Sequence, residues 1–301
     1  MITGIVRSMR AYQWTKNLVL FAGPIFTLRI LDPSIALASV AGFFAFSLAV
    51  SAVYLFNDIL DVERDRLHPE KQNRPIASGA LPIPVALVVA AVLLAIGLGS
   101  AAALGTRFAA AAAAYVILTG AYSVVLKRVV ILDVTAIATG FVLRAVAGVE
   151  LVRDRTHLGP ESIAISPWLL VCAFFLALFL ATGKRLHELE TLERDAARHR
   201  AALGAYTRPL LDQMIAVVTG ATVISYSVYT ISPETLAKYH GRPLYLTIPF
   251  VLYGIFRYLY LLYAEHKGGN PSEHLLRDRA TLVNVVLWCC AVLAILLWPV
   301  A

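Results

Sequence analysis

Long apolar runs separated by short polar segments dominate this chain. A helix needs about 20 apolar residues to cross the hydrocarbon core of a bilayer, and only helices and closed barrels satisfy their backbone hydrogen bonds there. The alternating pattern of barrel strands is absent, so we expect an all-α integral membrane protein. We predict nine transmembrane helices, of which the first is short and contains Gly23-Pro24, at residues 17–31, 35–56, 83–103, 107–126, 131–149, 164–183, 211–231, 244–263 and 281–299.

The distribution of lysine and arginine predicts the orientation of these spans. Of the 26 basic residues, 18 fall in the N-terminus and every second loop, 6 fall in the other loops, and Arg144 and Arg257 lie within spans. Cytoplasmic loops carry an excess of Lys and Arg. We therefore expect a multi-pass protein of the bacterial inner (cytoplasmic) membrane with its N-terminus in the cytoplasm and its C-terminus outside. Basic residues precede the first apolar run and no small-residue cleavage site follows it, so no cleavable signal peptide is expected.

The composition supports a membrane protein and limits the classes of molecule that we expect it to bind. Hydrophobic residues make up 59% of the chain and charged residues 15%, and the mean hydropathy is +0.74. No linker separates a soluble module, so residues 1–301 are expected to form a single membrane domain in the lipid bilayer. The net charge of +7 suits anionic headgroups and substrates, whereas no soluble basic domain is present to hold nucleic acid. The three cysteines lie in apolar spans and form neither a disulfide framework nor a zinc pattern.

A cluster of acidic residues follows the second apolar run, in Asn57-Asp58-Ile59-Leu60-Asp61-Val62-Glu63-Arg64-Asp65. On a helix, Asn57, Asp58, Asp61 and Asp65 lie at i, i+1, i+4 and i+8, so most of them share one face. Oxygen ligands in this pattern suit Mg²⁺, which takes one or two carboxylates together with waters and phosphate oxygens. Because Arg66, Lys71 and Arg74 follow at once, the pattern favours a diphosphate site over a solvated loop.

Two further polar clusters close other spans on the same predicted face. Tyr122-Ser123 and Lys127-Arg128 close the fourth span, and Lys184-Arg185 with Glu188 follow the sixth. Each basic pair alone is typical of membrane anchoring, but three clusters on one face beside carboxylates favour a shared anion site. The spacing of the polar loops after the second and sixth spans also hints at a duplicated four-helix unit.

These motifs resemble those of the UbiA-type intramembrane prenyltransferase superfamily, over about residues 7–298. The resemblance lies in the Asp-rich motif, in Arg74-Pro75-Ile76-Ala77-Ser78-Gly79 and in the Tyr-Ser-x-x-x-Lys element at 122–127. Within the superfamily the chain is similar to the decaprenyl-phosphate phosphoribosyltransferase branch, through Gln13-Trp14-Thr15-Lys16-Asn17-Leu18, Gly183-Lys184-Arg185 and Leu276-Arg277-Asp278-Arg279. The resemblance implies a UbiA-like bundle of nine transmembrane helices whose active site faces the cytoplasm.

One departure from the superfamily pattern decides which substrate is expected. Ordinary members carry a second Asp-rich motif after the sixth span, and the two motifs hold two Mg²⁺ on a prenyl diphosphate. Here that position carries Lys184 and Arg185, which bind anions directly through their charge. Such a site suits a donor with an extra phosphate, and the resemblance implies phosphoribosyl pyrophosphate (PRPP).

The expected reaction is Mg²⁺-dependent transfer of 5-phosphoribose from PRPP to a polyprenyl (decaprenyl-type) phosphate, for synthesis of a cell-envelope arabinose donor. Asp58, Asp61 and Asp65 are the expected catalytic residues, and with Asn57 they are the expected metal ligands. The residues expected to bind the donor phosphates are Lys71, Arg74, Tyr122, Lys127, Lys184, Arg185 and Glu188.

Some alternatives stay open at the level of the sequence. Lys16 and Arg144 are candidates for binding the lipid phosphate, but Arg144 equally suits a structural ion pair, since a charge inside a span must face the protein interior or a partner. A conventional prenyltransferase, which moves a prenyl group to an aromatic acceptor, is the second candidate function. A transporter of anionic metabolites is the third, and charges gathered at one membrane face rather than at the midplane disfavour it.

Overall fold

The computed structural model covers the whole chain and describes residues 1–67, 71–156, 166–192, 203–265 and 278–297. These residues form helices and short connections, and no strand occurs among them. The all-α class expected from the apolar runs is therefore confirmed.

Eight described helices are long and apolar enough to cross a membrane. In chain order they are α3 (Pro33–Leu60), α5 (Ile83–Leu104), α6 (Thr106–Val124), α7 (Leu132–Arg155), α8 (Pro167–Leu192), α10 (Arg208–Ile231), the run of η7 (Leu244–Thr247) and α12 (Ile248–Tyr263), and α14 (Arg279–Leu297). They correspond to the second to ninth predicted spans.

The first predicted span, 17–31, is not a single long α-helix. A 3₁₀-helix, η1 (Ala11–Phe21), is followed by the short helix α2 (Ala22–Phe26). Pro24 has no backbone N–H to donate, and its ring hinders a continuous helix through the preceding turn. The backbone here also packs closely on α7, because a Cβ on Gly148 would collide with the carbonyl of Leu20. The described residues thus contain eight long helices in place of nine.

The chain divides into two compact units. The first comprises residues 1–136 and 140–164, and the second comprises 137–139 and 165–301. Each unit contains four of the eight candidate spans, the number that the spacing of the polar loops suggested. A duplication, and a single membrane domain over the whole chain, stay predictions.

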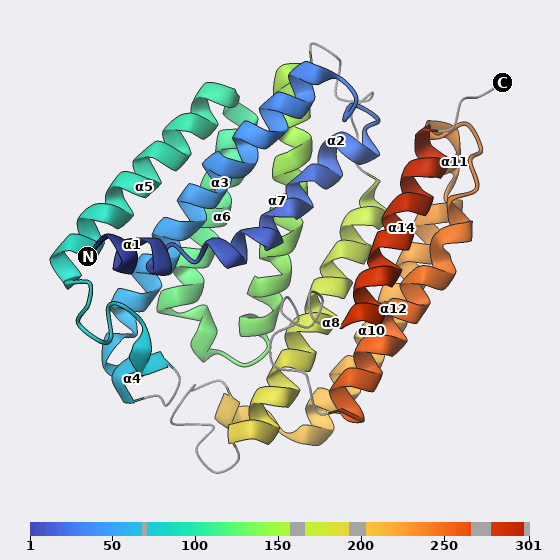
Figure 1. Cartoon of the computed structure of the whole chain (residues 1–301). Helices are drawn as coiled ribbons and strands as arrows, with labels where there is room; N and C mark the ends of the chain where they lie inside the picture. The colour runs from blue at the N-terminus through green and yellow to red at the C-terminus, as the bar shows by residue number, and fades with distance from the viewer. Residues whose placement is uncertain (68–70, 157–165, 193–202, 266–277, 298–301) are drawn as a thin grey trace. The chain divides into compact units, whose positions relative to one another are not determined.

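In the first unit, α3 is the central helix. In the most apolar stretch of α3, 61% of the residues are buried, whereas the figure for α5 is 22%. Helix α5 packs along α3. Gly97 permits this packing, since a Cβ there would lie 2.6 Å from the backbone nitrogen of Ala49. The N-terminal segment, blue in Figure 1, runs across α3. Hydrogen bonds hold it there, from Trp14 Nε1 to Ser51 Oγ (3.0 Å), from Asn17 Nδ2 to Ser47 Oγ (2.9 Å) and from Ser51 Oγ to the Met9 carbonyl (2.9 Å).

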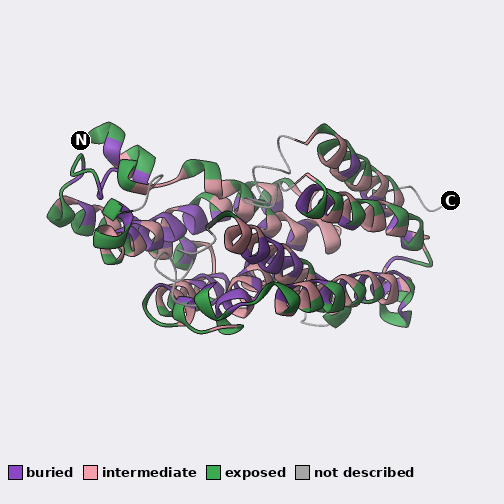
Figure 2. Cartoon of the chain, turned by 90° about the horizontal axis from the view of Figure 1, so that it is seen from below, coloured by how far each residue is buried: buried purple, intermediate pink, exposed green. Residues whose placement is uncertain are grey.

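In the second unit, α8 packs against α10, and α12 packs against α14. Side chains cap two of these helices: Thr207 Oγ1 accepts from the backbone of Leu210 at the start of α10, and Asp278 Oδ2 accepts from that of Thr281 at the start of α14. Only 17% of the apolar stretch of α14 is buried, so this helix faces outward along most of its length. Figure 2 shows many exposed residues along the helices of the chain, as expected for spans that contact lipid.

Candidate active site

The Asp-rich motif lies where α3 ends and the short helix α4 (Val62–Leu67) begins. The chain turns at Asp61, which follows the last residue of α3, and the backbone N–H of Asp65 bonds to the Asp61 carbonyl at 2.8 Å. The motif therefore spans two helices and a turn rather than the one continuous helix that the spacing suggested.

Arg74 joins two carboxylates of this motif. Its Nη1 atom lies 3.0 Å from Asp58 Oδ1 and 2.6 Å from Asp65 Oδ2. The two aspartates are almost fully buried, at 2% and 4% exposure. Charges buried to this degree are costly unless they are paired, which explains the position of Arg74. Burial raises the pKa of Asp65 above its ordinary value, and the Arg74 guanidinium opposes that rise.

Arg10 is the second cation on Asp58. Its Nη2 atom lies 2.5 Å from the same Oδ1 atom. Burial lowers the pKa of the Arg10 guanidinium, but the Asp58 carboxylate more than offsets this and leaves the pKa above its ordinary value. Arg10 lies between α1 (Ile2–Ser8) and η1, with a φ of 52°. Left-handed backbone is uncommon for a non-glycine residue and concentrates at functional sites.

Lys127 pairs with the remaining aspartate from another part of the chain. It lies in the turn η3 (Leu126–Arg128) after α6 and is 7% exposed. Its Nζ atom is 2.7 Å from both carboxylate oxygens of Asp61 and 3.2 Å from Asn57 Oδ1. The structure thus brings together Asn57, Asp61 and Lys127, three of the residues that the sequence analysis assigned to the site. Their roles stay predictions.

The carboxylates of the motif have the chemistry of a magnesium site, yet positive side chains pair with them. Among the described residues, no three groups of the His, Cys, Asp or Glu type converge on one point. Two carboxylate oxygens nevertheless face a common cation, Arg74 Nη1. Mg²⁺ is commonly held by one or two carboxylates, with water and phosphate completing its shell. The donor set therefore fits Mg²⁺ in kind, with Asp58 and Asp65 about one cation position and Asp61 turned toward Lys127.

Arg10 is the residue of this cluster that sequence reasoning missed. It counted only as part of the basic N-terminus, because a cation 48 positions from Asp58 gives no local signal. Arg7, three positions earlier, lies near the end of α1. Both arginines line a pocket of about 470 Å³ together with Asp58 and Arg74.

Three other predicted site residues lie near this cluster in sequence. Lys71 begins the short helix η2 (Lys71–Asn73), immediately before Arg74. Tyr122 lies in the last turn of α6, and Lys16 lies in η1 next to Asn17. All three side chains are half-buried, and their binding roles stay predictions.

Arg144 lies in the core of the first unit, 4% exposed. Its Nε donates to Asn17 Oδ1 at 2.9 Å and its Nη2 to the Tyr115 hydroxyl at 2.5 Å. The guanidinium also lies 4.6 Å from the centroid of the Tyr115 ring, a favourable cation–π distance. The part of the chain that the structure describes offers it no ion pair, so these neutral groups satisfy it instead. Its role toward a lipid phosphate stays a prediction.

The second unit contains the predicted cluster at the end of α8. Arg185 is buried, at 1% exposure, and its Nη1 lies 2.6 Å from Glu188 Oε2. The Lys184 side chain is 39% exposed, with Nζ 3.8 Å from Glu188 Oε1. Both cations therefore contact the same carboxylate, that of Glu188. Arg185 is enclosed far more than an open phosphate-binding cation would be.

Arg257, the other arginine within a span, has a structural partner. Its Nη2 lies 2.7 Å from Asp278 Oδ1, at the start of α14. The hydrogen bond from Arg257 holds the pKa of Asp278 below its ordinary value. Asp278 belongs to the Leu276–Arg279 motif, whose Leu276 and Arg277 lie outside the described residues.

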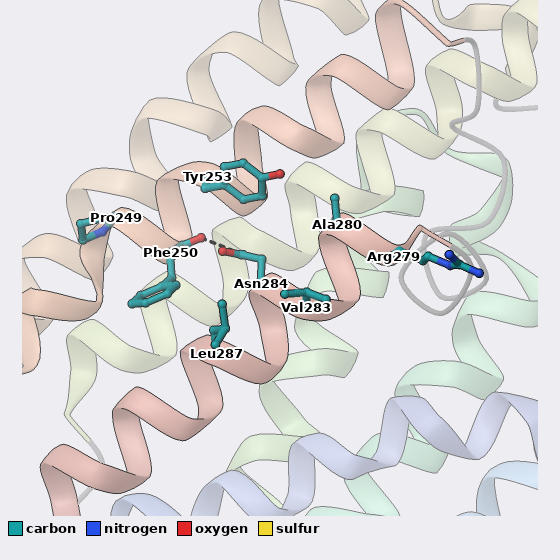
Figure 3. Close-up of a pocket in the computed structure, with 8 residues that line it drawn as sticks. All are labelled: Pro249, Phe250, Tyr253, Arg279, Ala280, Val283, Asn284 and Leu287. Carbon is teal, nitrogen blue, oxygen red and sulfur yellow. Dashed lines mark hydrogen bonds between the residues drawn. The ribbon is translucent and has the colours of Figure 1, made fainter.

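A hollow of about 660 Å³ lies between α12 and α14 in the second unit (Figure 3). Its wall is mostly apolar, with Arg279 as the one charge among the described residues that line it, and Asn284 Nδ2 donates to the Phe250 carbonyl at 2.9 Å. Tyr253, also in the wall, is 49% exposed. A wall of this kind suits contact with lipid chains.

Comparison with known proteins identifies the family. Residues 18–274 match the UbiA prenyltransferase family. A decaprenyl-phosphate phosphoribosyltransferase from Corynebacterium glutamicum is 34% identical over 98% of this chain and 88% of its own length. The enzyme of the same name from Mycobacterium tuberculosis is 32% identical, over 97% of this chain and 94% of its own length.

Solved structures agree on the fold. A UbiA homolog from Archaeoglobus fulgidus bound to GPP and Mg²⁺ superposes with a TM-score of 0.69 at 19% identity, covering 97% of this chain and 99% of that chain. At that identity the likeness concerns the fold alone. The family match covers most of the chain and the relatives cover nearly all of it, so this protein belongs to the UbiA prenyltransferase family of membrane transferases.

Proposed function

We propose that this protein transfers 5-phosphoribose from PRPP to a polyprenyl phosphate of the decaprenyl type and releases pyrophosphate. The relatives named for decaprenyl-phosphate phosphoribosyl transfer, at 32–34% identity over nearly the whole chain, are the observation that carries this proposal. The product would serve synthesis of the arabinose donor of a cell envelope. The excess of basic residues supports a reaction at the cytoplasmic face, where soluble sugar phosphates occur.

Asp58, Asp61 and Asp65, with Asn57, would hold Mg²⁺ on the diphosphate of PRPP. A bound Mg²⁺ supplies Lewis-acid stabilisation of the charge that develops on the leaving diphosphate. The ion pairs of the Asp cluster support this assignment, since Arg74 Nη1 already lies between two carboxylate oxygens.

The remaining positive charge would neutralise and orient the two anionic substrates. Arg74 carries further N–H donors beside the Nη1 group that bonds the aspartates, so it can contact phosphate oxygens as well. The three N–H donors of Lys127 face Asp61 and Asn57, so Lys127 would contribute chiefly its positive charge. Lys71 and Tyr122, with Lys184, Arg185 and Glu188 of the second unit, are the other proposed donor-phosphate residues. Lys16 and Arg144 are the proposed residues for the lipid phosphate.

The acceptor requires little activation. A phosphate monoester is anionic at pH 7, so its oxygen can attack C1 of the ribose without a general base. The C1–O bond to the diphosphate breaks as the new C1–O bond forms, and the ribose passes through an oxocarbenium-like state. Catalysis would then rest on orientation and electrostatic stabilisation.

The alternative function is that of a conventional prenyltransferase. It stays a candidate because a solved UbiA homolog of the same fold is bound to GPP and Mg²⁺. The test incubates purified protein with two substrate mixtures. The first contains labelled PRPP and a long polyprenyl phosphate, and the second contains a prenyl diphosphate and an aromatic acid. Labelled lipid from the first mixture, and its loss on removal of Mg²⁺ with a chelator, are the expected results. Product from the second mixture alone would favour prenyl transfer.

A further inference from the structure

A pocket of about 470 Å³ in the first unit lies beside Asp58, on the side of the N-terminal helix α1. Its wall includes three guanidinium groups, those of Arg7, Arg10 and Arg74, and one carboxylate, that of Asp58. Asp65 pairs with Arg74 from outside the wall, so the three arginines exceed the two carboxylates by one positive charge. A net positive wall of this kind suits an anion such as a phosphate monoester, which carries nearly two negative charges at pH 7.

Ser8 provides an independent sign that a ligand belongs in this pocket. The residue lines the pocket and is 1% exposed, and its Oγ has no hydrogen-bond partner among the described residues. A buried hydroxyl without a partner costs free energy, and such groups are uncommon in folded proteins. An acceptor oxygen bound in the pocket would accept a hydrogen bond from this hydroxyl.

The arginines of the wall retain donors for a ligand. The Arg7 side chain is exposed and makes no hydrogen bond or ion pair with the described part of the chain. Arg10 bonds Asp58 through Nη2, and Arg74 bonds its two aspartates through Nη1. A guanidinium has five N–H donors in a planar fork that matches phosphate oxygens. The left-handed backbone of Arg10, with a φ of 52°, keeps its side chain at this wall rather than along α1.

We propose that this pocket binds a phosphate monoester and, if the proposed function holds, that the monoester is the 5-phosphate of PRPP. Asp58 is both a wall residue and a proposed metal ligand, so a phosphate here would lie next to a diphosphate on the Asp cluster. That is the arrangement needed for the two ends of one small donor. The pocket suits this role better than the cluster on α8 does, because Arg185 there is 1% exposed and bonded to Glu188.

Binding of two probes to the purified full-length protein in nanodiscs tests the proposal. Ribose 5-phosphate has the phosphate monoester of PRPP but lacks its diphosphate. Inorganic pyrophosphate has the diphosphate but lacks the monoester. We expect Arg7→Gln to weaken binding of ribose 5-phosphate about tenfold, as the loss of a charge-assisted hydrogen bond would. Ser8→Ala should weaken it about threefold, in keeping with a neutral hydrogen bond. Neither change should alter pyrophosphate binding measured by titration calorimetry.

Arg107→Gln is the matched control, because Arg107 is an exposed arginine at the opposite end of α6 from Lys127. The proposal is overturned if Arg7→Gln and Ser8→Ala bind ribose 5-phosphate as the control does. A rise in KM for polyprenyl phosphate with unchanged ribose 5-phosphate binding would also overturn it, and would assign the pocket to the lipid phosphate.

The same measurements separate this proposal from the proposed function. Binding of ribose 5-phosphate that depends on Arg7, in a protein that forms no labelled lipid from PRPP, supports the pocket and rejects the phosphoribosyl transfer. Transfer from PRPP combined with binding of ribose 5-phosphate that is insensitive to Arg7 and Ser8 rejects the pocket alone.

Discussion

Lys127 Nζ lies 2.7 Å from both carboxylate oxygens of Asp61, which precedes it by 66 residues. The contact ties the turn after α6 to the turn after α3. Lys127 is 7% exposed, and Asp61 is the counter-ion of this buried side chain. An aspartate expected to bind metal is thus also the counter-ion of a buried lysine, and the two roles can be separated by experiment.

Asp61→Asn should lower activity by at least about 100-fold, because it removes the charge of a proposed metal ligand. It should also lower the free energy of unfolding by about 1–3 kcal/mol, because Lys127 is left buried without a counter-ion. Adding Lys127→Met should restore much of the stability and none of the activity. Thermal unfolding in detergent and the rate of labelled lipid formation measure the two effects.

Glu63→Gln is the control for this series. Glu63 belongs to the same motif but is 79% exposed and pairs only with Arg66 at the surface. It should leave both quantities nearly unchanged. Activity restored together with stability in the double variant would show that Asp61 acts only as a counter-ion.

Arg74→Gln should destabilise the protein by about 1–3 kcal/mol and raise the KM for PRPP. The change removes the ion pair of Asp65 with Arg74 and, among the described residues, leaves Asp58 paired with Arg10. Arg66→Gln is the matched control, because Arg66 is half exposed and, within the part of the chain that the structure describes, bonds Glu63 and the carbonyl of Ala77. Equal effects of the two substitutions on KM would remove the reason to assign Arg74 to the donor.

Periodicity and hydropathy predict the long helices because a membrane span is defined by its own apolar residues. The same pattern does not distinguish an α-helix from a 3₁₀-helix, so 17–31 was expected as a span although η1 and α2 occupy most of it. In that segment Pro24 and the close approach to Gly148 decide the backbone.

The aspartates of the site were predictable from the sequence, whereas the basic residues that pair with them were predictable only in part. Asp58 and Asp61 follow an apolar run, where carboxylates need a cation, so the sequence itself indicates a charged site. Which cation meets which carboxylate depends on tertiary contacts. Arg10 reaches Asp58 because Ser51 Oγ bonds the Met9 carbonyl and fixes the N-terminal segment on α3. No local pattern carries that information.

Arg144→Met should test whether this arginine is structural. The change leaves Asn17 Oδ1 and the Tyr115 hydroxyl oxygen without their hydrogen-bond donor in the core, so we expect a loss of about 1–3 kcal/mol in stability. Tyr115→Phe, which removes only one of these groups, should cost less. Unchanged stability with a raised KM for polyprenyl phosphate would instead assign Arg144 to the lipid phosphate.

The pair of Arg257 and Asp278 predicts a dependence of stability on pH in the second unit. Arg257 lowers the pKa of Asp278 below its ordinary value of 3.8. A carboxylate with a lowered pKa in the fold contributes stability above its unfolded pKa, and loses that contribution as the pH falls toward the folded value. At pH 6 Asp278→Asn should therefore melt several degrees below the parent, since it also weakens the cap on α14. Below about pH 4 the gap should narrow. In an Arg257→Gln background the difference in melting temperature should change less with pH, because the partner that lowers the pKa of Asp278 is absent. A gap that stays constant from pH 6 to pH 3 would mean that Asp278 acts through the Thr281 cap alone.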